Sequence, residues 1–404
     1  MGSFVSERVK GIPTSGIRVI FEKANRMSGV IRLEVGEPDF DTPAQVTAAA
    51  KRALDQGLTH YTSSAGILPL REAISAKLRR ENDIDADPAT EVVVTPGAGA
   101  AVYLSIMCTI NPGDEVLLPD PAWPHYEACI DLAGGRAVRY PTHEHLGFRP
   151  DVEEVSKLVT EKTRAILINS PSNPTGSVLD RKDLEGIADL ARSRDLLVYS
   201  DEVYEKIVYG GVRNHSIASF DGMKERTVTI NALSKTYAMT GWRVGYAAAQ
   251  PEIAAQMAKL NLFTSGCPNS FAQAAAVEAL IGPQGDVERM LKEYAARRDL
   301  MVRRLSGMEG VSCGSPGGAF YAFPRVDIQG MNAFETSMFL LDNAKVAAVP
   351  GSSFGPLGEN HLRLSYATSM ENIREGMDRI DSAIRAAASQ KVATPQQRSG
   401  LKSK

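Results

Sequence analysis

The segment 227-TVTINALSKTYAMTGWRVGYA-247 holds two short apolar runs, residues 227–230 and 244–247, on either side of a polar stretch. Short, nearly continuous apolar runs are typical of strands that are buried on both faces. Lys235 follows the first run, and Arg243 directly precedes the second. Ligands of open α/β sheets bind at the edge where the strands end. A lysine and an arginine at this edge could hold a phosphate and leave an amine for covalent chemistry.

The same pattern extends along the chain in both directions. Further apolar runs alternate with helical patterns such as 100–110 and 183–194, and these runs are 91–95, 115–118, 165–168 and 196–199. Such alternation predicts an α/β fold with a mostly parallel sheet. We expect residues 44–285 to form this large domain.

The chain changes character at about residue 286. A charged amphipathic helix at 286–305, a strand at 319–323 and helices at 333–344 and 371–388 indicate a smaller α+β domain, residues 286–388. The N-terminal segment, residues 1–43 with a helix at 16–27, could pack on either domain and is grouped with the smaller one. Residues 389–404 are mostly small, polar or basic, which is typical of a flexible tail.

Composition and charge exclude several classes of protein. Lys and Arg total 45 and Asp and Glu 48, so the net charge of -3 argues against a general nucleic-acid binder. No apolar stretch approaches the roughly 20 residues that span a membrane. The four cysteines form no CxxC pair, which argues against zinc binding and indicates reduced thiols in a cytoplasmic protein. His143-Glu144-His145 has no third ligand at useful spacing, so no metal site is expected.

Three other predicted strands are followed by motifs that could bind a ligand. Asp201 and Tyr204 lie in DEVY (201–204), Asn173 lies in NSPSNPTG (169–176), and Trp123 lies in PDPAWPHY (119–126). Taken alone, each has an ordinary explanation, such as an N-cap aspartate, a rigid turn or a packed tryptophan. The small-residue turn 95–100 could present backbone N–H groups to an anion at a helix N-terminus. Together these groups are the ones that would hold pyridoxal 5'-phosphate (PLP).

The residues of these motifs and their order along the chain resemble those of the fold type I aminotransferases of class I and II, from about Gly36 to Ala367. The resemblance implies a homodimer, with Lys235 as the Schiff-base lysine, Asp201 on the ring nitrogen and Tyr61 reaching the phosphate of the neighbouring subunit. The implied cofactor contacts are Tyr61, Ala98, Gly99, Trp123, Asn173, Asp201, Tyr204, Ser234, Lys235 and Arg243. Ala98, Gly99 and Arg243 would hold the phosphate, Tyr204 and Asn173 the phenolic oxygen, and Trp123 would stack on the ring.

The resemblance also implies how an amino acid is gripped. Arg363, in HLRLSYA, would bind its carboxylate with both arms of the guanidinium, and the backbone of Gly36 would meet the same group. Trp123 and Asn173 would border the substrate as well. Ile17 and Phe354 are further candidates for contact with its side chain.

Two positions depart from the family pattern. Ala232 stands where a serine or threonine often contacts the phosphate, and Ser234 is a candidate replacement. Gly99 stands where some aspartate-specific members carry a lysine, which permits an uncharged substrate side chain.

The implied function is a PLP-dependent aminotransferase that moves an amino group from an L-amino acid, aspartate or one of a broad set, to a 2-oxo acid. The two substrates would react in turn, with Lys235 as the proton shuttle. A PLP-dependent lyase or decarboxylase on the same fold is the alternative, because the cofactor can break a different bond at Cα. A ligand-sensing regulator is disfavoured, because motifs that begin by Gly36 leave little room for an added DNA-binding domain. No membrane or nucleic-acid partner is expected.

Overall fold

The computed structural model describes residues 4–12, 16–328 and 330–392. Its largest element is an eight-stranded sheet of order β2-β9-β8-β7-β6-β3-β4-β5. The strands are β2 (Val92–Thr95), β3 (Glu115–Asp120), β4 (Arg136–His143), β5 (Arg149–Pro150), β6 (Thr163–Asn169), β7 (Leu197–Asp201), β8 (Thr227–Ala232) and β9 (Gly245–Ala248). The five strands from β8 to β4 run parallel, and only β2–β9, β9–β8 and β4–β5 pair antiparallel. The mostly parallel α/β sheet expected from the sequence is thereby confirmed.

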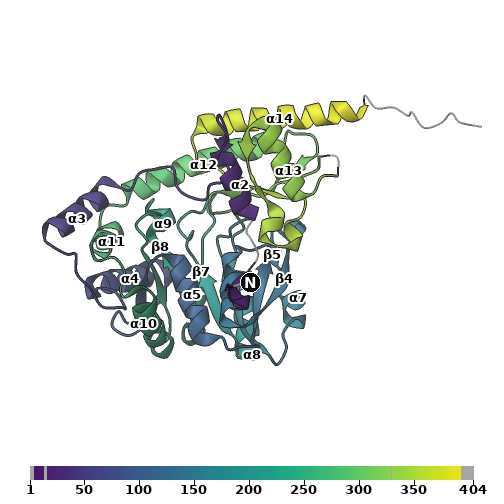
Figure 1. Ribbon diagram of the computed structural model, residues 1–404. Coiled ribbons are helices and arrows are strands. Elements are labelled where there is room, and N and C mark those ends of the chain that lie inside the picture. Colours follow the sequence, from purple (N-terminus) through teal and green to yellow (C-terminus); the bar gives the residue numbers. More distant parts are fainter. Residues whose placement is uncertain (1–3, 13–15, 329, 393–404) are drawn as a thin grey trace, which may run out of the picture.

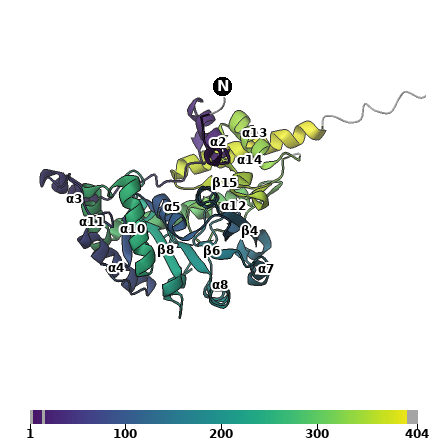
Figure 2. The same cartoon turned by 60° about the horizontal axis from the view of Figure 1, so that its bottom comes forward.

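Helices cover both faces of this sheet because its strands carry apolar side chains on alternate sides. One face packs on α5 (Ala98–Thr109), α6 (His125–Ala133) and α10 (Pro251–Ser265). The opposite face packs on α7 (Val152–Lys157) and α8 (Arg181–Ser193) near β6 and β7. Near β2 and β9 the same face packs on α3 (Ala44–Asp55), α4 (Leu68–Asn82) and α11 (Ser270–Ile281). Figure 2 shows α10 and α8 on the two sides of the sheet near β8 and β6.

A second group of elements lies above the sheet in Figure 1, around α12 (Gly285–Leu305), α13 (Ala333–Phe339) and α14 (Met370–Val392). These helices accompany a small antiparallel sheet of β11 (Tyr321–Ala322), β15 (Leu362–Ser365) and β14 (Val349–Pro350). A separate two-stranded antiparallel sheet, β10 (Val311–Ser312) with β12 (Arg325–Val326), belongs to the same group.

The N-terminal segment packs on this second group. Strand β1 (Ile31–Arg32) pairs in parallel with β13 (Val346–Ala347). Helix α2 (Gly16–Asn25) buries Ile20 and Ala24 against Leu341 and Ala347. The short helices α1 (Glu7–Lys10) and α9 (Leu233–Thr236) complete the α-helical set of the described residues. The expected division into two domains, residues 44–285 and residues 1–43 with 286–388, stays a proposal. One apolar cluster joins Tyr204 and Ala232 of the first to α12 and α14 of the second.

The expected elements differ from the observed ones mainly at their ends. All seven expected strands exist, but β3 and β7 run on to Asp120 and Asp201, and the strand expected at 319–323 is only the two residues of β11. Strand β4 was missed because its half-exposed, mixed sequence lacks an apolar run. The helix expected at 333–344 is α13 followed by a π-helical turn, Leu340–Ala344. The expected tail begins inside α14, and its residues 393–404 lie outside the described part of the chain.

The centre of the sheet offers a test of this layering. Leu117 of β3 is fully buried against α8 side chains. We expect Leu117→Ala to lower the free energy of unfolding by about 2–5 kcal/mol, because it removes buried methyl groups and leaves a cavity. Val212→Ala, at a half-exposed loop position, should change it by less than about 0.5 kcal/mol. Urea unfolding followed by circular dichroism measures both, and equal effects would contradict the layering.

Candidate active site

A cavity of about 490 Å³ opens at the ends of the parallel strands, between the large sheet and the second group of elements. It is the place where the motifs of the sequence meet. Eleven of the twelve expected site residues line it: Gly36, Ala98, Gly99, Trp123, Asn173, Asp201, Tyr204, Ser234, Lys235, Arg243 and Arg363. The twelfth, Tyr61, does not.

Lys235 lies in α9, the short helix that begins directly after β8. Its Nζ donates to the backbone oxygen of Gly36 at 2.5 Å. Burial, together with the nearby positive charge of Arg363, lowers the pKa of Lys235 to about 8. A lysine amine is nucleophilic only when unprotonated, and at neutral pH a larger fraction of this amine is unprotonated than of an exposed lysine.

Asp201 is the last residue of β7 and is almost fully buried. Its carboxylate accepts hydrogen bonds from the Tyr126 hydroxyl at 2.6 Å and from the backbone N–H of Val203 at 3.2 Å. Burial raises its pKa, against the effect of the Tyr126 hydrogen bond. No lysine, arginine or histidine of the described residues forms an ion pair with Asp201. The charge of Lys235 acts on Asp201 only without direct contact, so a cation in the cavity would find a carboxyl group that is free to form an ion pair.

Asn169 connects Asp201 to Asn173. It ends β6 beside Asp201 of β7. Its amide donates to the backbone oxygen of Asp201 at 3.0 Å, and its side-chain oxygen accepts from the backbone N–H of Asn173 at 2.9 Å. The Pro-rich loop after β6 is thus held to the neighbouring strand, which fixes where Asn173 enters the cavity.

Arg363 is a buried cation without a carboxylate partner among the described residues. Strand β15 carries it, and 4% of the residue is exposed. It donates to Asn173 Oδ1 at 3.0 Å and to the backbone oxygen of Glu34 at 2.7 Å, and its Nε has no hydrogen-bond partner in the described part of the chain. The guanidinium lies over the ring of Tyr321 at 4.6 Å. Since an isolated buried charge is costly, an anionic ligand would be strongly stabilised here.

Gly36 permits close approach to this guanidinium. A Cβ at position 36 would lie 2.8 Å from the Tyr321 hydroxyl and 3.7 Å from Arg363 Nη2. Only glycine leaves this space open, so a small carboxylate could lie between the backbone of Gly36 and Arg363.

A second anion-binding corner lies at the N-terminus of α5. Gly97 precedes this helix with a φ of 88°, and a Cβ there would lie 2.4 Å from Arg243 Nη2. Ala98 and Gly99 begin the helix, where backbone N–H groups have no helical partner. Arg243 Nη1 and Nη2 donate to backbone oxygens of Thr240 and Pro96 at 3.0 and 3.2 Å, which holds the guanidinium beside these N–H groups. The corner combines a helix N-terminus with a positioned arginine, an arrangement suited to a phosphate group.

Three residues of the site were missed in the sequence. Tyr126 bonds Asp201, Asn169 bonds both Asp201 and Asn173, and the Tyr321 hydroxyl lies 2.8 Å from that of Tyr204. Tyr126 and Asn169 stand at the ends of the motifs that gave Trp123 and Asn173, so those motifs contained the signal. Tyr321 lay in an expected apolar strand, where nothing marked its hydroxyl as functional.

The other residues that the sequence analysis singled out differ in their position relative to the cavity. Tyr61 is 92% exposed on this chain, away from the cavity. Ile17 of α2 lines the cavity, whereas Phe354 lies beneath Arg363, with its ring 5.1 Å from the guanidinium carbon. Ala232 is buried in the apolar cluster that includes Tyr204.

Two other expectations concern metals and membranes. His143 pairs with Glu154 at 2.9 Å, and the described residues contain no cluster of metal-ligating side chains. No helix of the described chain is long and apolar enough to cross a membrane.

Comparison with known proteins gives close matches over nearly the full length. The family model described as aminotransferase class I and II matches residues 28–380. An aspartate aminotransferase of Pyrococcus abyssi is 49% identical over 383 residues, which cover 94% of this chain and 98% of the relative. Aromatic-amino-acid aminotransferase 2 of Thermococcus litoralis is 46% identical with the same coverage. The crystal structure of an aromatic aminotransferase from Pyrococcus horikoshii matches with a TM-score of 0.87 at 47% identity, covering 92% of this chain and 100% of that one.

The pKa of Lys235 can be tested on cofactor-free protein. Because that pKa is about 8, half of the amine is unprotonated at that pH, and acetylation of Lys235 should reach its plateau near pH 9. The acetylation rate of exposed lysines, which have an ordinary pKa of about 10.4, should instead keep rising with pH up to at least about pH 10. Competitive acetylation with acetic anhydride, read by peptide mass spectrometry, gives both profiles. A Lys235 profile that follows the exposed lysines would contradict the burial argument.

Proposed function

The chain belongs to the class I and II aminotransferases, and from this premise we propose that it works with PLP held in the cavity, with Lys235 as the catalytic lysine. As an aminotransferase it moves amino groups between amino acids and 2-oxo acids. The observation that carries the proposal is a set of three ionisable groups in one cavity, none with an ion-pair partner among the described residues: the amine of Lys235, the carboxyl of Asp201 and the guanidinium of Arg363.

The cavity fits PLP group by group. The corner made by α5, Ser234 and Arg243 suits the phosphate. Asp201 suits a protonated ring nitrogen, since a nearby cation lowers the pKa that burial raises. Trp123 offers an aromatic face. When bound, PLP supplies an aldehyde that combines with amines and a cationic ring that draws electrons from the substrate's Cα.

The residues of the chain supply orientation and proton transfer. Arg363 would bind the substrate carboxylate with two parallel hydrogen bonds, and Gly36 leaves room for that carboxylate. The carboxylate, once held, fixes the direction of the Cα–H bond. Lys235, with a pKa of about 8, can take this proton at neutral pH and return it. Asn173 and Tyr204 would bond the ring's phenolic oxygen.

The substrate side chain would meet the N-terminal wall of the cavity. Ile17, Phe21 and Val35 make this wall largely apolar, and Glu37 adds a carboxylate that accepts from Thr240 at 2.9 Å. These contacts support a broad set of donors that includes apolar and aromatic amino acids, and the matched relatives are named for aspartate and for aromatic amino acids. A lyase or decarboxylase is not favoured, since these relatives are aminotransferases.

We also propose a cytoplasmic homodimer. Four large exposed side chains would offer a surface for a second copy of the chain. They are Leu58 and Tyr61 in the segment after α3, and Leu262 and Phe263 near the end of α10. In such a dimer Tyr61 would reach the phosphate in the other subunit. All four cysteines are free thiols, as in a reducing compartment.

The function is tested by absorbance and product analysis together. Adding single L-amino acids to wild-type protein should change the visible band of bound PLP and release one matching 2-oxo acid per site. Lys235→Ala should keep PLP binding but lower turnover by at least about 10³-fold, because it removes the amine that would carry the proton. Ammonia or carbon dioxide as the product would instead support a lyase or decarboxylase, and absence of any PLP band in wild-type protein would refute the proposal.

The role of Arg363 has its own signature. We expect Arg363→Leu to raise the KM for the amino donor by about 100-fold, because a bidentate charge-assisted contact is lost. Arg298→Leu serves as the control, since Arg298 is a largely buried arginine on α12, outside the cavity. Steady-state kinetics with two donors measures both variants. A KM for Arg363→Leu within threefold of wild type would show that this arginine does not bind the carboxylate.

A further inference from the structure

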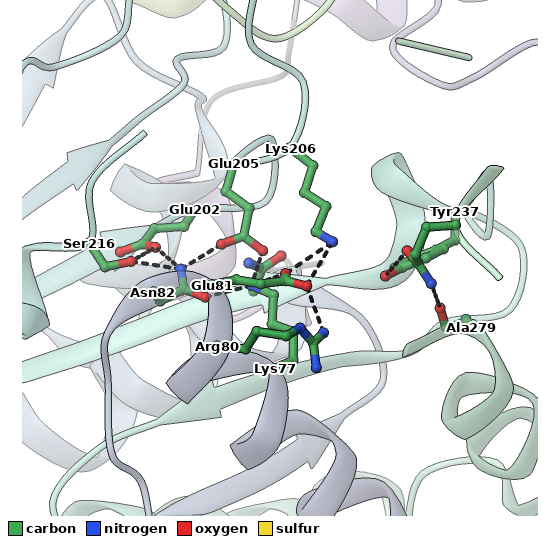
Figure 3. Close-up of polar contacts among 12 residues, drawn as sticks. Lys77, Arg80, Glu81, Asn82, Glu202, Glu205, Lys206, Ser216, Tyr237 and Ala279 are labelled. Carbon is green, nitrogen blue, oxygen red and sulfur yellow. Dashed lines mark hydrogen bonds and ion pairs between the residues drawn. The ribbon is translucent and has the colours of Figure 1, made fainter. Parts of the chain in front are cut away.

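The turn that carries two of the proposed PLP contacts has a polar side away from the cavity. In residues 201–205, Asp201, Val203 and Tyr204 line the cavity, whereas Glu202 and Glu205 do not. Figure 3 shows these two glutamates directed at the end of α4. Their contacts belong to a buried cluster, here named the α4 network, which consists of Lys77, Asn82, Glu202, Glu205 and Ser216.

Asn82 is the shared donor of this network. Its Nδ2 lies 2.6 Å from Glu205 Oε2, 2.8 Å from Ser216 Oγ and 3.3 Å from Glu202 Oε2. Its side-chain oxygen accepts from Lys77 Nζ at 2.8 Å. One amide on the last residue of α4 thus holds both glutamates of the turn.

Lys77 is the only cation of the described residues in contact with either glutamate. It forms an ion pair with Glu205, and its side chain is 4% exposed. Glu202 receives hydroxyl hydrogen bonds from Ser200 at 2.8 Å and from Ser216 instead. Burial and the charge of Glu205 raise the pKa of Glu202 to about 7. Lys77 also lies 3.8 Å from Glu81, but Glu81 has Arg80 and Lys206 as further partners. The buried Glu202 and the mostly buried Glu205 therefore have Lys77 as their one neighbouring cation among the described residues, and its loss would leave charge uncompensated.

The backbone connects the two sides of the turn closely. Asp201 ends β7, the N–H of Glu202 donates to Ile230 of β8, and that of Glu205 donates to Glu202. With so few residues between them, displacement of Glu202 or Glu205 also displaces Asp201 and Tyr204. We propose that Asn82 and Lys77 are positioning residues, which hold the outer side of this turn from α4 and thereby fix Asp201 and Tyr204 at the PLP site. This inference rests on the proposed PLP role of the cavity.

The first test compares two alanine variants on the same helix. Asn82→Ala removes the shared amide, and Ser75→Ala removes an equally buried hydroxyl that bonds Ala86 and does not touch the turn. We expect cofactor-free Asn82→Ala to bind PLP about tenfold more weakly, equivalent to about one lost hydrogen bond. Its kcat should fall about 100-fold because the catalytic geometry loosens. The KM for the amino donor should stay within about threefold of wild type, since Arg363 and Gly36 are untouched.

Two readouts separate positioning from mere stability. Amides 201–207 of cofactor-free Asn82→Ala should exchange with deuterium faster than in Ser75→Ala, and the pH midpoint of the PLP absorbance change should shift only in Asn82→Ala. Equal exchange, PLP affinity and absorbance midpoint in the two variants would overturn the proposal. A wild-type protein that binds no PLP would refute the proposed function instead, while the exchange comparison would still report on the turn.

A charge rescue covers the case in which Asn82→Ala does not fold. Lys77→Met leaves Glu202 and Glu205 without their cation, and Lys77→Met/Glu205→Gln removes one of the two negative charges as well. We expect the double variant to recover most of the PLP affinity that the single variant loses, because a buried unpaired charge costs more than a neutral pair. PLP affinity by fluorescence titration measures this, and a double variant as weak as the single one would overturn the role of Lys77.

Discussion

The site depends on the hydrogen-bonded register of three parallel strands. Asn169 of β6 lies opposite Asp201 of β7, and Asp201 lies opposite Ile230 of β8. Parallel strands place their carboxyl ends at one edge, so the loop to Asn173, the turn to Tyr204 and the helix that carries Lys235 all leave the sheet together. A shift of one residue in any of these pairings would turn the side chains to the opposite face.

The same edge concentrates buried ionisable groups that form no direct ion pairs among the described residues. Lys235, Asp201 and Arg363 all lie at one cavity, and burial shifts the pKa of Lys235 down and that of Asp201 up. Such groups cost folding free energy unless a ligand compensates them. We interpret these groups as preorganised for binding: they are already in position before the ligand arrives. A ligand with a phosphate, a cationic ring nitrogen and a carbonyl group, as we propose for PLP, would offset the cost of burying them. The second group of elements supplies Arg363 and the N-terminal segment supplies Gly36, so the cavity is complete only when both pack on the sheet.

Much of the fold and most of the site could be predicted from the sequence, for a physical reason. Strands buried on both faces appear as short apolar runs, and the ligand edge follows each run, so the positions of Lys235, Asp201 and Asn173 in the sequence are enough to place them on one edge. The matched family confirms the aminotransferase assignment. Tyr126, Asn169 and Tyr321 could not be singled out, because their role lies in contacts between distant segments. The α4 network was invisible for the same reason, since Asn82 and Glu202 are 120 residues apart.

We propose above that PLP combines with one particular lysine at this edge, Lys235. The most direct measurement is borohydride reduction of PLP-loaded protein, followed by peptide mapping with mass spectrometry. We expect a single pyridoxyl-phosphate adduct on the peptide that contains Lys235, and we expect it to disappear when an excess of an accepted amino donor is added before reduction. An adduct on another lysine, or none in protein that has been loaded with PLP, would contradict it.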